Sequence, residues 1–518
     1  MLCGRTWDSN RLVWFRSGGS MPKGDTEARS KEQETPQDTS QRAQGEGGRR
    51  VRVRSAEGRT FKEKQQERSQ KAQESGADGE KDGQDEEPQL PLLSAPAGGV
   101  PPIVEDESGL DKVTRALEDS FGPIAVDTER AQGRTYGSGA YLLQLKREGG
   151  KTFLVDPRAF PDLDQLAGPM RTEWILHAPD QDLGALAELG LAPTSLFDTE
   201  IAARLLGARK FGLGALTESY LGVRLAKAHQ NEDWSKRPLP ESWLSYAALD
   251  VELLPELRGV LAELLDRQER SEWAAQEFVY QLEHPTEQRP HEWWSVKGLG
   301  RVKRPADLAI AKELWEARER LAQETDVAPG RILTPKAIVE ASLARPAKRR
   351  DVLRIMDFRR PLAKRNMELW WEAIERAYAL PEGEYPKRPA ADPYEVPGAA
   401  QWKRHDPEAF ERLTQVRALV ARAGERLDLD TEVVLNGRDQ RLMAWWPLDR
   451  EVPEPGKARG RKRSLASGPA FLRAVEQRLG ASQARAWQQQ QFLAEVEQAL
   501  HRGGSEVAAL QAAVPRAR

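Results

Sequence analysis

Four short apolar segments between residues 121 and 178 constrain the fold most, because each has the length of a buried strand. They read FGPIAVDT, AYLLQLKR, KTFLVDP and RTEWILHA. The second and third are separated by Gly149 and Gly150, a spacing typical of a β-hairpin. We therefore expect these segments to form one sheet that contains a hairpin.

Helical patterns follow the strands. Apolar residues recur at helical spacing over 183–189, which predicts an amphipathic helix. A second helix is predicted between Asp198, its expected N-cap, and Gly207, and a long one from about 240 to 268. Strands followed by alternating helices indicate an α/β domain with a mixed sheet, which we place at residues 100–275.

Beyond residue 285 the apolar pattern is helical throughout. The stretch ERLAQETDV at 319–327 matches ERLDLDTEV at 425–433, an offset of 106 residues. We interpret the match as two copies of one small helical domain. The predicted boundaries are a first helical domain at 285–380, a Pro-rich linker at 381–400, a second helical domain at 401–503 and a C-terminal tail at 504–518.

Residues 1–99 form a charged leader that is predicted to be disordered. Its composition is dominated by Glu, Gln, Lys, Arg, Ser and Gly, with too little apolar surface to offset the entropy of ordering the chain. Either Met1 or Met21 could be the initiator. The role of the leader stays open.

The net charge, the cysteine content and the length of the apolar runs exclude several classes of protein. The 518 residues carry a formal net charge of −3, so any contact with nucleic acid must come from local patches. Cys3 is the single cysteine, which excludes an internal disulfide framework or a Cys-based zinc site and favours a reducing cytoplasm. No apolar run approaches the roughly 20 residues of a membrane-spanning helix.

Acidic residues at particular spacings predict a metal site. Asp127 and Glu129 lie two apart on a strand, so they share a face, and Tyr246 and Asp250 lie four apart on a helix, so they do too. Asp182 stands where a strand ends and a helix begins, a usual place for site residues in α/β proteins. Four carboxylates brought together repel one another unless cations balance them. Two Mg²⁺ or Mn²⁺ ions would do so through hard oxygen ligands, and such a pair promotes phosphoryl displacement.

Each of these motifs also has an ordinary structural explanation. Asp-x-Glu is frequent on strands, an acidic helix start stabilises the helix dipole, and Tyr-x-x-x-Asp is an ordinary helix face. For Asp198 we favour a helix cap over a ligand, and for His177 a structural role at a strand end. Only the order and context of the motifs together are specific.

Taken together, these motifs resemble those of the DEDD 3'–5' exonucleases, and most closely the ribonuclease D family. The resemblance rests on AVDTE, LHAPDQDL with FDT, and YAALDVELL, together with NEDWSKRPL before the last of these. It implies a ribonuclease H-like mixed-sheet exonuclease domain. Arg130 is a departure, because many family members carry an aromatic or apolar residue there.

The family roles carry over to matching positions. Asp127, Glu129, Asp182 and Asp250 would hold two divalent ions. Tyr246 would orient the attacking water, which places the chain in the Tyr subclass.

The helical part resembles an HRDC domain, a small module that binds nucleic acid. EWWSVKGLG and RPADLAIAKELWEARE carry this likeness, and residues 401–503 look like a second such domain. The fold class expected is therefore α/β followed by two small all-α HRDC-type domains. Basic residues gather at 345–365 and again at 457–463. Two interpretations stay open for these runs: an ordinary solvated face, or contact with RNA phosphates. The candidates for phosphate contact are named here the arginine cluster: Arg349, Arg350, Arg359 and Arg360.

The resemblance implies a cytoplasmic, metal-dependent 3'–5' exoribonuclease, and we expect a monomer. The expected substrate is the 3' end of structured RNA such as a tRNA precursor, with nucleoside 5'-monophosphates as products. Two alternatives stay open: a DNA 3'–5' exonuclease of repair, and an RNA-binding scaffold without catalysis that kept the fold.

Overall fold

The computed structural model describes residues 90–131, 133–226, 232–285, 292–389, 395–448 and 468–503. The leader up to residue 89, the alternative start Met21, the basic stretch 457–463 and the tail 504–518 lie outside the described residues. Among the helices that are described, none combines the length and apolar character needed to cross a membrane.

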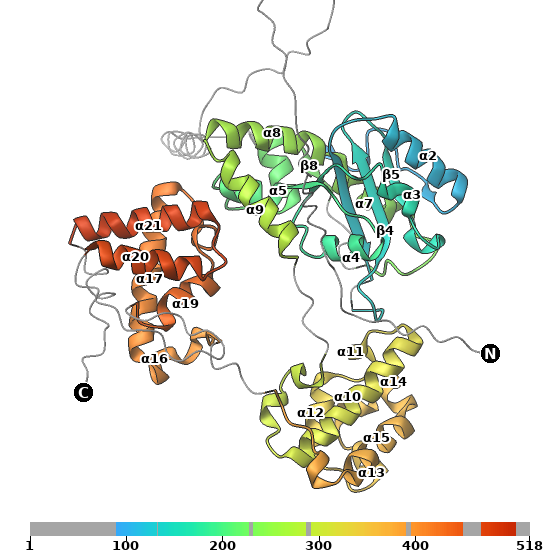
Figure 1. Ribbon diagram of the computed structural model, residues 1–518. Coiled ribbons are helices and arrows are strands. Elements are labelled where there is room, and N and C mark those ends of the chain that lie inside the picture. Colours follow the sequence, from blue (N-terminus) through green and yellow to red (C-terminus); the bar gives the residue numbers. More distant parts are fainter. Residues whose placement is uncertain are drawn as a thin grey trace, which may run out of the picture. The chain divides into compact units, whose positions relative to one another are not determined.

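A six-stranded mixed sheet forms the first domain (Figure 1). The strands are β2 (Ile103–Val104), β3 (Ile124–Arg130), β4 (Ala140–Arg147), β5 (Thr152–Val155), β6 (Glu173–Leu176) and β7 (Ser195–Asp198). Their order is β2-β5-β4-β3-β6-β7. The β3–β4 and β4–β5 pairs are antiparallel, and the other three pairs are parallel. The predicted α/β fold with a mixed sheet is confirmed.

Strand β3 lies inside the sheet, between β4 and β6. Ile124, Ala125 and Val126 are fully buried, because both faces of the sheet are covered at this point. The hairpin between β4 and β5 turns at Gly149, whose φ of 70° suits a residue without a side chain. The strand therefore delivers Asp127 and Glu129 from a rigid, central position.

Ten helical segments accompany the sheet in the described residues. They are α2 (Glu107–Glu118), η1 (Pro157–Ala159), α3 (Asp164–Ala167), α4 (Asp182–Glu188), α5 (Thr199–Leu205), α6 (Leu213–Leu216), η2 (Thr217–Leu221), α7 (Glu241–Glu252), α8 (Leu254–Arg267) and α9 (Ser271–Glu283). Helix α7 packs on β3, β4 and β5. The single helix predicted over 240–268 is wrong in one respect, because it breaks at Leu253. Pro255 has no N–H to donate and its ring crowds the preceding turn, so α8 starts anew.

The folded domain begins earlier than predicted. The leader was expected to extend to residue 99, but Leu92–Leu93 forms β1, which pairs in parallel with β8 (Arg224–Leu225). The Ser245 hydroxyl also donates to the carbonyl of Ser94, 2.9 Å away. A two-residue strand has no periodicity of its own, and the edge with which it pairs lies more than a hundred residues away.

The first helical domain has its own core, in which Phe358 and Trp370 are fully buried. Its elements are η3 (Trp293–Ser295), η4 (Leu299–Arg301), α10 (Pro305–Thr325), α11 (Pro329–Ile332), α12 (Pro335–Ala344), α13 (Arg349–Val352), η5 (Met356–Arg359), α14 (Pro361–Arg365), α15 (Met367–Ala379) and η6 (Glu382–Glu384). Helix α10 packs against α12 and α15. Helix α10 opens at Pro305, in agreement with the helical pattern of apolar residues beyond residue 285.

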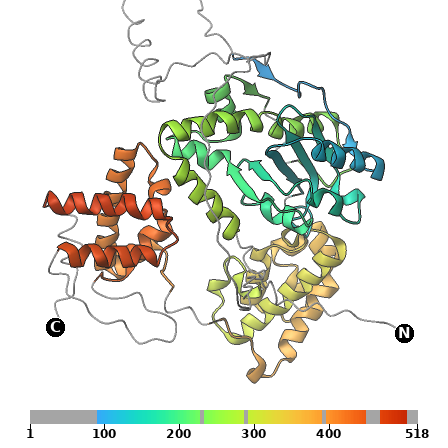
Figure 2. The same ribbon diagram turned by 45° about the horizontal axis from the view of Figure 1, so that its top comes forward.

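The last described elements are again helical. They are η7 (Ala399–Gln401), α16 (Trp402–His405), α17 (Pro407–Leu427), α18 (Thr431–Val434), α19 (Gly437–Trp445), α20 (Gly468–Gly480) and α21 (Ala486–His501). Figure 2 shows α20 and α21 as two long red helices that lie side by side, and they contact each other directly.

The order of three helices repeats, with an offset of 102 residues rather than 106. Helices α10 and α17 both have 21 residues and both end at an aspartate with left-handed backbone, Asp326 and Asp428. A four-residue helix follows each, and the next helix is capped by Thr334 in one copy and Asn436 in the other. The sequence match was therefore about one helical turn out of register. A shift of four residues keeps the same helix face, so apolar periodicity alone does not reveal it.

Candidate metal centre and nucleic-acid contacts

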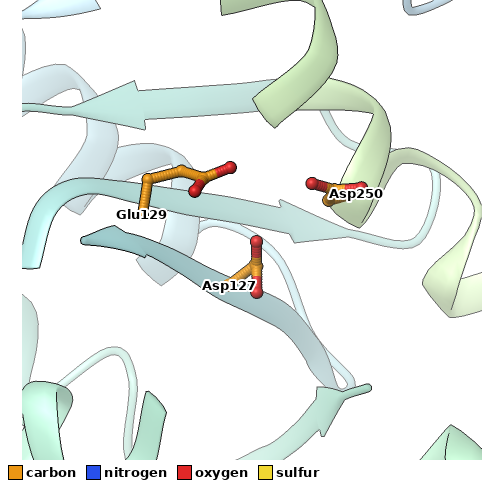
Figure 3. A group of neighbouring side chains, drawn as sticks. All are labelled: Asp127, Glu129 and Asp250. Atoms are coloured by element: carbon orange, nitrogen blue, oxygen red, sulfur yellow. The ribbon is translucent and has the colours of Figure 1, made fainter. Parts of the chain in front are cut away.

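Three carboxylates meet above the centre of the sheet. Asp127 and Glu129 project from the same face of β3, and Asp250 comes from α7, which covers that face (Figure 3). One oxygen from each of the three lies within 4.8 Å of the others. Strand alternation predicted the shared face of the first two residues. The packing of α7 on β3 adds the third.

Burial and mutual repulsion raise the pKa values of this group. Desolvation raises the pKa of Glu129 to about 9 and that of Asp250 to about 7, and neighbouring carboxylates add to both shifts. The pKa of Asp127 is raised well above its usual range for the same two reasons. The cluster therefore holds protons at neutral pH unless a cation replaces them.

Asp182 lies beside the cluster but is held differently. It is buried at the start of α4, and its Oδ1 accepts a hydrogen bond from the Thr128 hydroxyl at 2.5 Å. Nη2 of Arg130 lies 4.0 Å from the same oxygen. Desolvation raises the pKa of Asp182, whereas Thr128 and Arg130 oppose that rise. Asp182 and Asp127 line the same hollow, and the charge of Asp182 raises the pKa of Asp127.

Tyr246 and Asp250 share one face of α7, as their spacing predicts. The Tyr246 hydroxyl is hydrogen-bonded to the Asp250 carboxylate, which lowers the pKa of Asp250. Burial, followed by the charges of Asp250, Glu129 and Asp127, raises the pKa of Tyr246 far above its usual value. The phenol therefore stays protonated and can donate or accept a hydrogen bond at the cluster.

A hollow of about 500 Å³ opens onto these side chains. Its volume falls in the range of small-ligand pockets, roughly 300–1,000 Å³. Leu213, Leu225 and Leu254 line it together with the acidic residues, and Arg130 lines it as well. Among the described residues, Nε of Arg130 has no hydrogen-bond partner. The hollow thus combines apolar surface, a buried acidic group and one cation.

The structure separates two other predicted residues from the cluster. Asp198 caps α5 by accepting from the N–H of Glu200 at 2.9 Å, as expected, and burial raises its pKa to about 6. His177 contacts Thr199 through Nδ1 at 3.0 Å, and burial lowers its pKa to about 4, so it is neutral. His177 nevertheless lines the hollow. Sequence reasoning did not foresee the contact of Thr128 with Asp182, since strand alternation directs Thr128 away from Asp127.

The chemistry of the donor set fits divalent cations. Carboxylate oxygens are the hard ligands that Mg²⁺ and Mn²⁺ prefer. Three carboxylates converge here, and Arg130 is the only Arg or Lys among the described residues that line the hollow. Cationic side chains therefore do not balance the charges of the carboxylates. A metal ion would replace the bound protons and remove the repulsion between these groups.

The arginine cluster lies on the first helical domain, and all four of its members are exposed. Arg349 forms an ion pair with Glu368 at 2.6 Å, and Nε of Arg359 donates to the carbonyl of Leu353 at 2.7 Å. The nearby Arg345 is different, because it pairs with the buried Asp307 at 3.3 Å. We therefore regard Arg345 as part of the domain's own packing.

Comparison with protein families matches three parts of the chain. Residues 101–266 match a family described as 3'-5' exonuclease, and residues 307–374 match the HRDC domain. Residues 395–500 match a family described as 3' to 5' exonuclease C-terminal domain.

Solved structures agree with this fold. A crystal structure of a protein from Bifidobacterium adolescentis is 32% identical, with a TM-score of 0.67, and the match covers 80% of this chain and 100% of that one. The structure of Escherichia coli RNase D, described as an exoribonuclease involved in structured RNA processing, is 22% identical with a TM-score of 0.55. That match covers 73% of this chain and 98% of the E. coli chain, and at this identity it supports the fold alone.

Curated relatives of similar sequence further support the assignment to a family. Ribonuclease D of Pseudomonas paraeruginosa is 29% identical over 364 residues, which is 68% of this chain and 92% of the relative. Ribonuclease D of Gluconacetobacter diazotrophicus is 32% identical over 295 residues, which is 55% of this chain and 73% of the relative. Together with the exonuclease and HRDC matches and the acidic cluster on β3 and α7, these likenesses show that the chain belongs to the ribonuclease D family of metal-dependent 3'–5' exoribonucleases.

Proposed function

We propose that this enzyme trims the 3' ends of structured RNA, such as tRNA precursors, and releases nucleoside 5'-monophosphates. The observation that carries the proposal is the convergence of Asp127, Glu129 and Asp250 at a hollow large enough for a small ligand. The RNase D of E. coli, which has the same fold, is described as acting in structured RNA processing.

The geometry supports a role for each residue of the cluster. Asp127, Glu129 and Asp250 would hold divalent ions directly, and Asp182 would complete the set from the start of α4. Bound Mg²⁺ or Mn²⁺ would stabilise the attacking and leaving oxygens of the phosphodiester. Tyr246 would orient the attacking water, because its protonated hydroxyl already lies against Asp250.

The surroundings of the cluster support binding of a terminal nucleotide. Leu213, Leu225 and Leu254 offer apolar surface to a base or sugar, while the acidic residues are reserved for the metal and the scissile phosphate. Arg130 would add a positive charge to a hollow that otherwise repels RNA. It would contact the phosphate backbone next to the cleaved bond.

The helical domains would hold the body of the RNA. We propose that the residues 401–503 form a second HRDC-like domain, and the 102-residue repeat of helix order supports this. The arginine cluster supplies exposed guanidinium groups for phosphates. The cytoplasmic location and the monomeric state stay predictions from the sequence.

Digestion of matched substrates tests the proposal. A tRNA precursor with a 3' extension, an unstructured RNA of equal length and the corresponding DNA would be incubated with Mg²⁺, with Mn²⁺ or with EDTA. We expect metal-dependent shortening from the 3' end of RNA and release of 5'-monophosphates, with Asp250→Asn as the inactive control. Preferential digestion of DNA would support the alternative of a DNA exonuclease. RNA binding without digestion would support the scaffold.

A further inference from the structure

The loop that leads to Asp182 has an unusual backbone. It connects β6 to α4, and Ala178 within it has a φ of 56°, a left-handed backbone conformation that residues other than glycine rarely adopt. Pro179 follows directly, and its carbonyl accepts hydrogen bonds from the N–H groups of Asp182 and Leu183, both at 3.0 Å. The position of Asp182 therefore depends on how the chain is held at Ala178.

Asp198 holds the chain at that point. Its Oδ1 accepts from the N–H of Ala178 at 3.0 Å as well as from the N–H of Glu200 at 2.9 Å. Its Oδ2 accepts from Nε2 of Gln281, on α9, at 2.9 Å. Asp198 is 1% exposed, so these three bonds replace solvent entirely.

The place of Asp198 in the sheet explains why it can reach this loop. Asp198 ends β7 and pairs in register with Leu176, which ends β6. The carboxyl ends of neighbouring parallel strands therefore lie side by side. Thr199 reinforces the junction, because its hydroxyl donates to the Leu176 carbonyl at 3.2 Å.

A helix cap alone does not account for these contacts. Capping of α5 needs only the bond from Glu200, and an exposed Asp, Ser or Thr would supply it. The bonds from Ala178 and Gln281 join Asp198 to two other elements. Ala178 donates to the same Oδ1 that caps α5, whereas Gln281 donates to Oδ2, an oxygen that Ser and Thr side chains lack.

We propose that Asp198 is a positioning residue for Asp182: it fixes the left-handed turn at Ala178, so that the Asp182 carboxylate faces the metal site. The inference rests on the proposed role of Asp182 as a ligand. Asp198 itself makes no contact with the cluster of Asp127, Glu129 and Asp250 among the bonds and groups described. It acts through the backbone of the β6–α4 loop.

Two substitutions separate positioning from capping. Asp198→Ser keeps a hydroxyl that can cap α5 but removes the acceptor of Gln281. Because Oγ of Ser lies closer to the backbone than Oδ1 does, the substitution also draws the acceptor away from Ala178. Asp198→Asn keeps Oδ1 as the acceptor for the N–H groups of Ala178 and Glu200. Its amide N–H can donate to Oε1 of Gln281 if the Gln281 amide group flips. Turning is feasible, because Oε1 of Gln281 has no hydrogen-bond partner among the described residues.

The readout is Mn²⁺ binding to the full-length protein, measured by electron paramagnetic resonance, with thermal unfolding as the control for folding. Loss of a group that orients a ligand lowers metal affinity about 10- to 100-fold, and we expect this for Asp198→Ser. Asp198→Asn should bind Mn²⁺ like the wild type. Equal Mn²⁺ affinity in a well-folded Asp198→Ser would overturn the proposal.

A double-mutant cycle with Asp182→Asn distinguishes this inference from the proposed function. If Asp198 acts through Asp182, Asp198→Ser should cause no further loss of Mn²⁺ affinity once Asp182 is changed. Additive losses would overturn the positioning role. If Asp182→Asn by itself leaves Mn²⁺ binding and activity unchanged, the role of Asp182 in the proposed function fails instead.

Gln281→Met provides a second route, should Asp198→Ser fold poorly. It removes the donor to Oδ2 and leaves Asp198 and the cap in place. We expect a smaller loss of Mn²⁺ affinity that also disappears in the Asp182→Asn background. A loss that persists in that background would count against the proposal.

Discussion

Glu129→Gln should make the metal-free protein more stable and at the same time destroy its function. Burial and nearby carboxylates raise the pKa of Glu129 from 4.5 to about 9. At pH 7 the unfolded chain ionises this group, whereas the folded metal-free protein keeps it protonated. Because pH 7 lies well above the ordinary pKa of 4.5, holding this proton lowers the free energy of unfolding by about 3 kcal/mol. A neutral Gln avoids this loss.

The sign of the pH dependence is fixed by the direction of the shift. A carboxyl group whose folded pKa is raised stabilises the protein fully below its unfolded pKa, and that stability is lost as the pH rises through the folded pKa. In EDTA, the advantage of Glu129→Gln over the wild type should therefore grow from about pH 5 to about pH 9. Mg²⁺ should reverse the order, because it stabilises only a protein that binds it.

Urea denaturation in EDTA and in Mg²⁺, repeated across this pH range, measures both effects. Glu148→Gln is the matched control: Glu148 lies in the turn between β4 and β5, is exposed and is outside the cluster. It should change neither the stability in EDTA nor the response to Mg²⁺. The reasoning is refuted if Glu129→Gln is no more stable than the wild type in EDTA at pH 8 to 9, or if Mg²⁺ stabilises it as strongly as the wild type.

Three other expectations concern the same surfaces. Asp127→Asn and Asp250→Asn should each lower the single-turnover rate by orders of magnitude while RNA affinity persists. Tyr246→Phe should lower the rate less, because it removes one hydroxyl and leaves the metal ligands in place. Near-normal rates would exclude these roles. Mg²⁺ binding should release protons and tighten as the pH rises, since the carboxyl groups hold protons in its absence, and calorimetry in buffers of different ionisation enthalpy would detect this. Replacing the whole arginine cluster by Ala should weaken binding of every RNA sequence about equally and reduce its salt dependence, with little change in rate at saturating RNA. An unchanged salt slope would make the cluster an ordinary solvated surface.

Local chemistry determined much of this protein before any tertiary contact was known. The alternation of side chains along a strand is a property of the backbone, so Asp127 and Glu129 had to share a face once β3 formed. Caps and breaks are equally local, and Asp198 begins α5 as its sequence context predicts. The mixed α/β fold and the helical domains follow from the two periodicities of the apolar residues.

Tertiary structure decided which local features meet. Only the packing of α7 on β3 brings Asp250 within 4.8 Å of Asp127 and Glu129, since more than a hundred residues separate them in the chain. The hydrogen bond from Thr128 to Asp182 and the second use of Asp198 at Ala178 were equally unpredictable, because each joins residues from different strands and loops. A sequence read along the chain reports spacing, whereas these contacts depend on how strands are ordered in the sheet.

The helical repeat shows the same limit in another form. Apolar periodicity revealed that residues after 285 form helices, and a short match suggested two copies. It placed them 106 residues apart, whereas the caps at Thr334 and Asn436 place them at 102. One face of a helix recurs about every turn, so the apolar pattern permits several registers. The helix ends, where capping side chains and left-handed aspartates close each copy, select one register because they have no such periodicity.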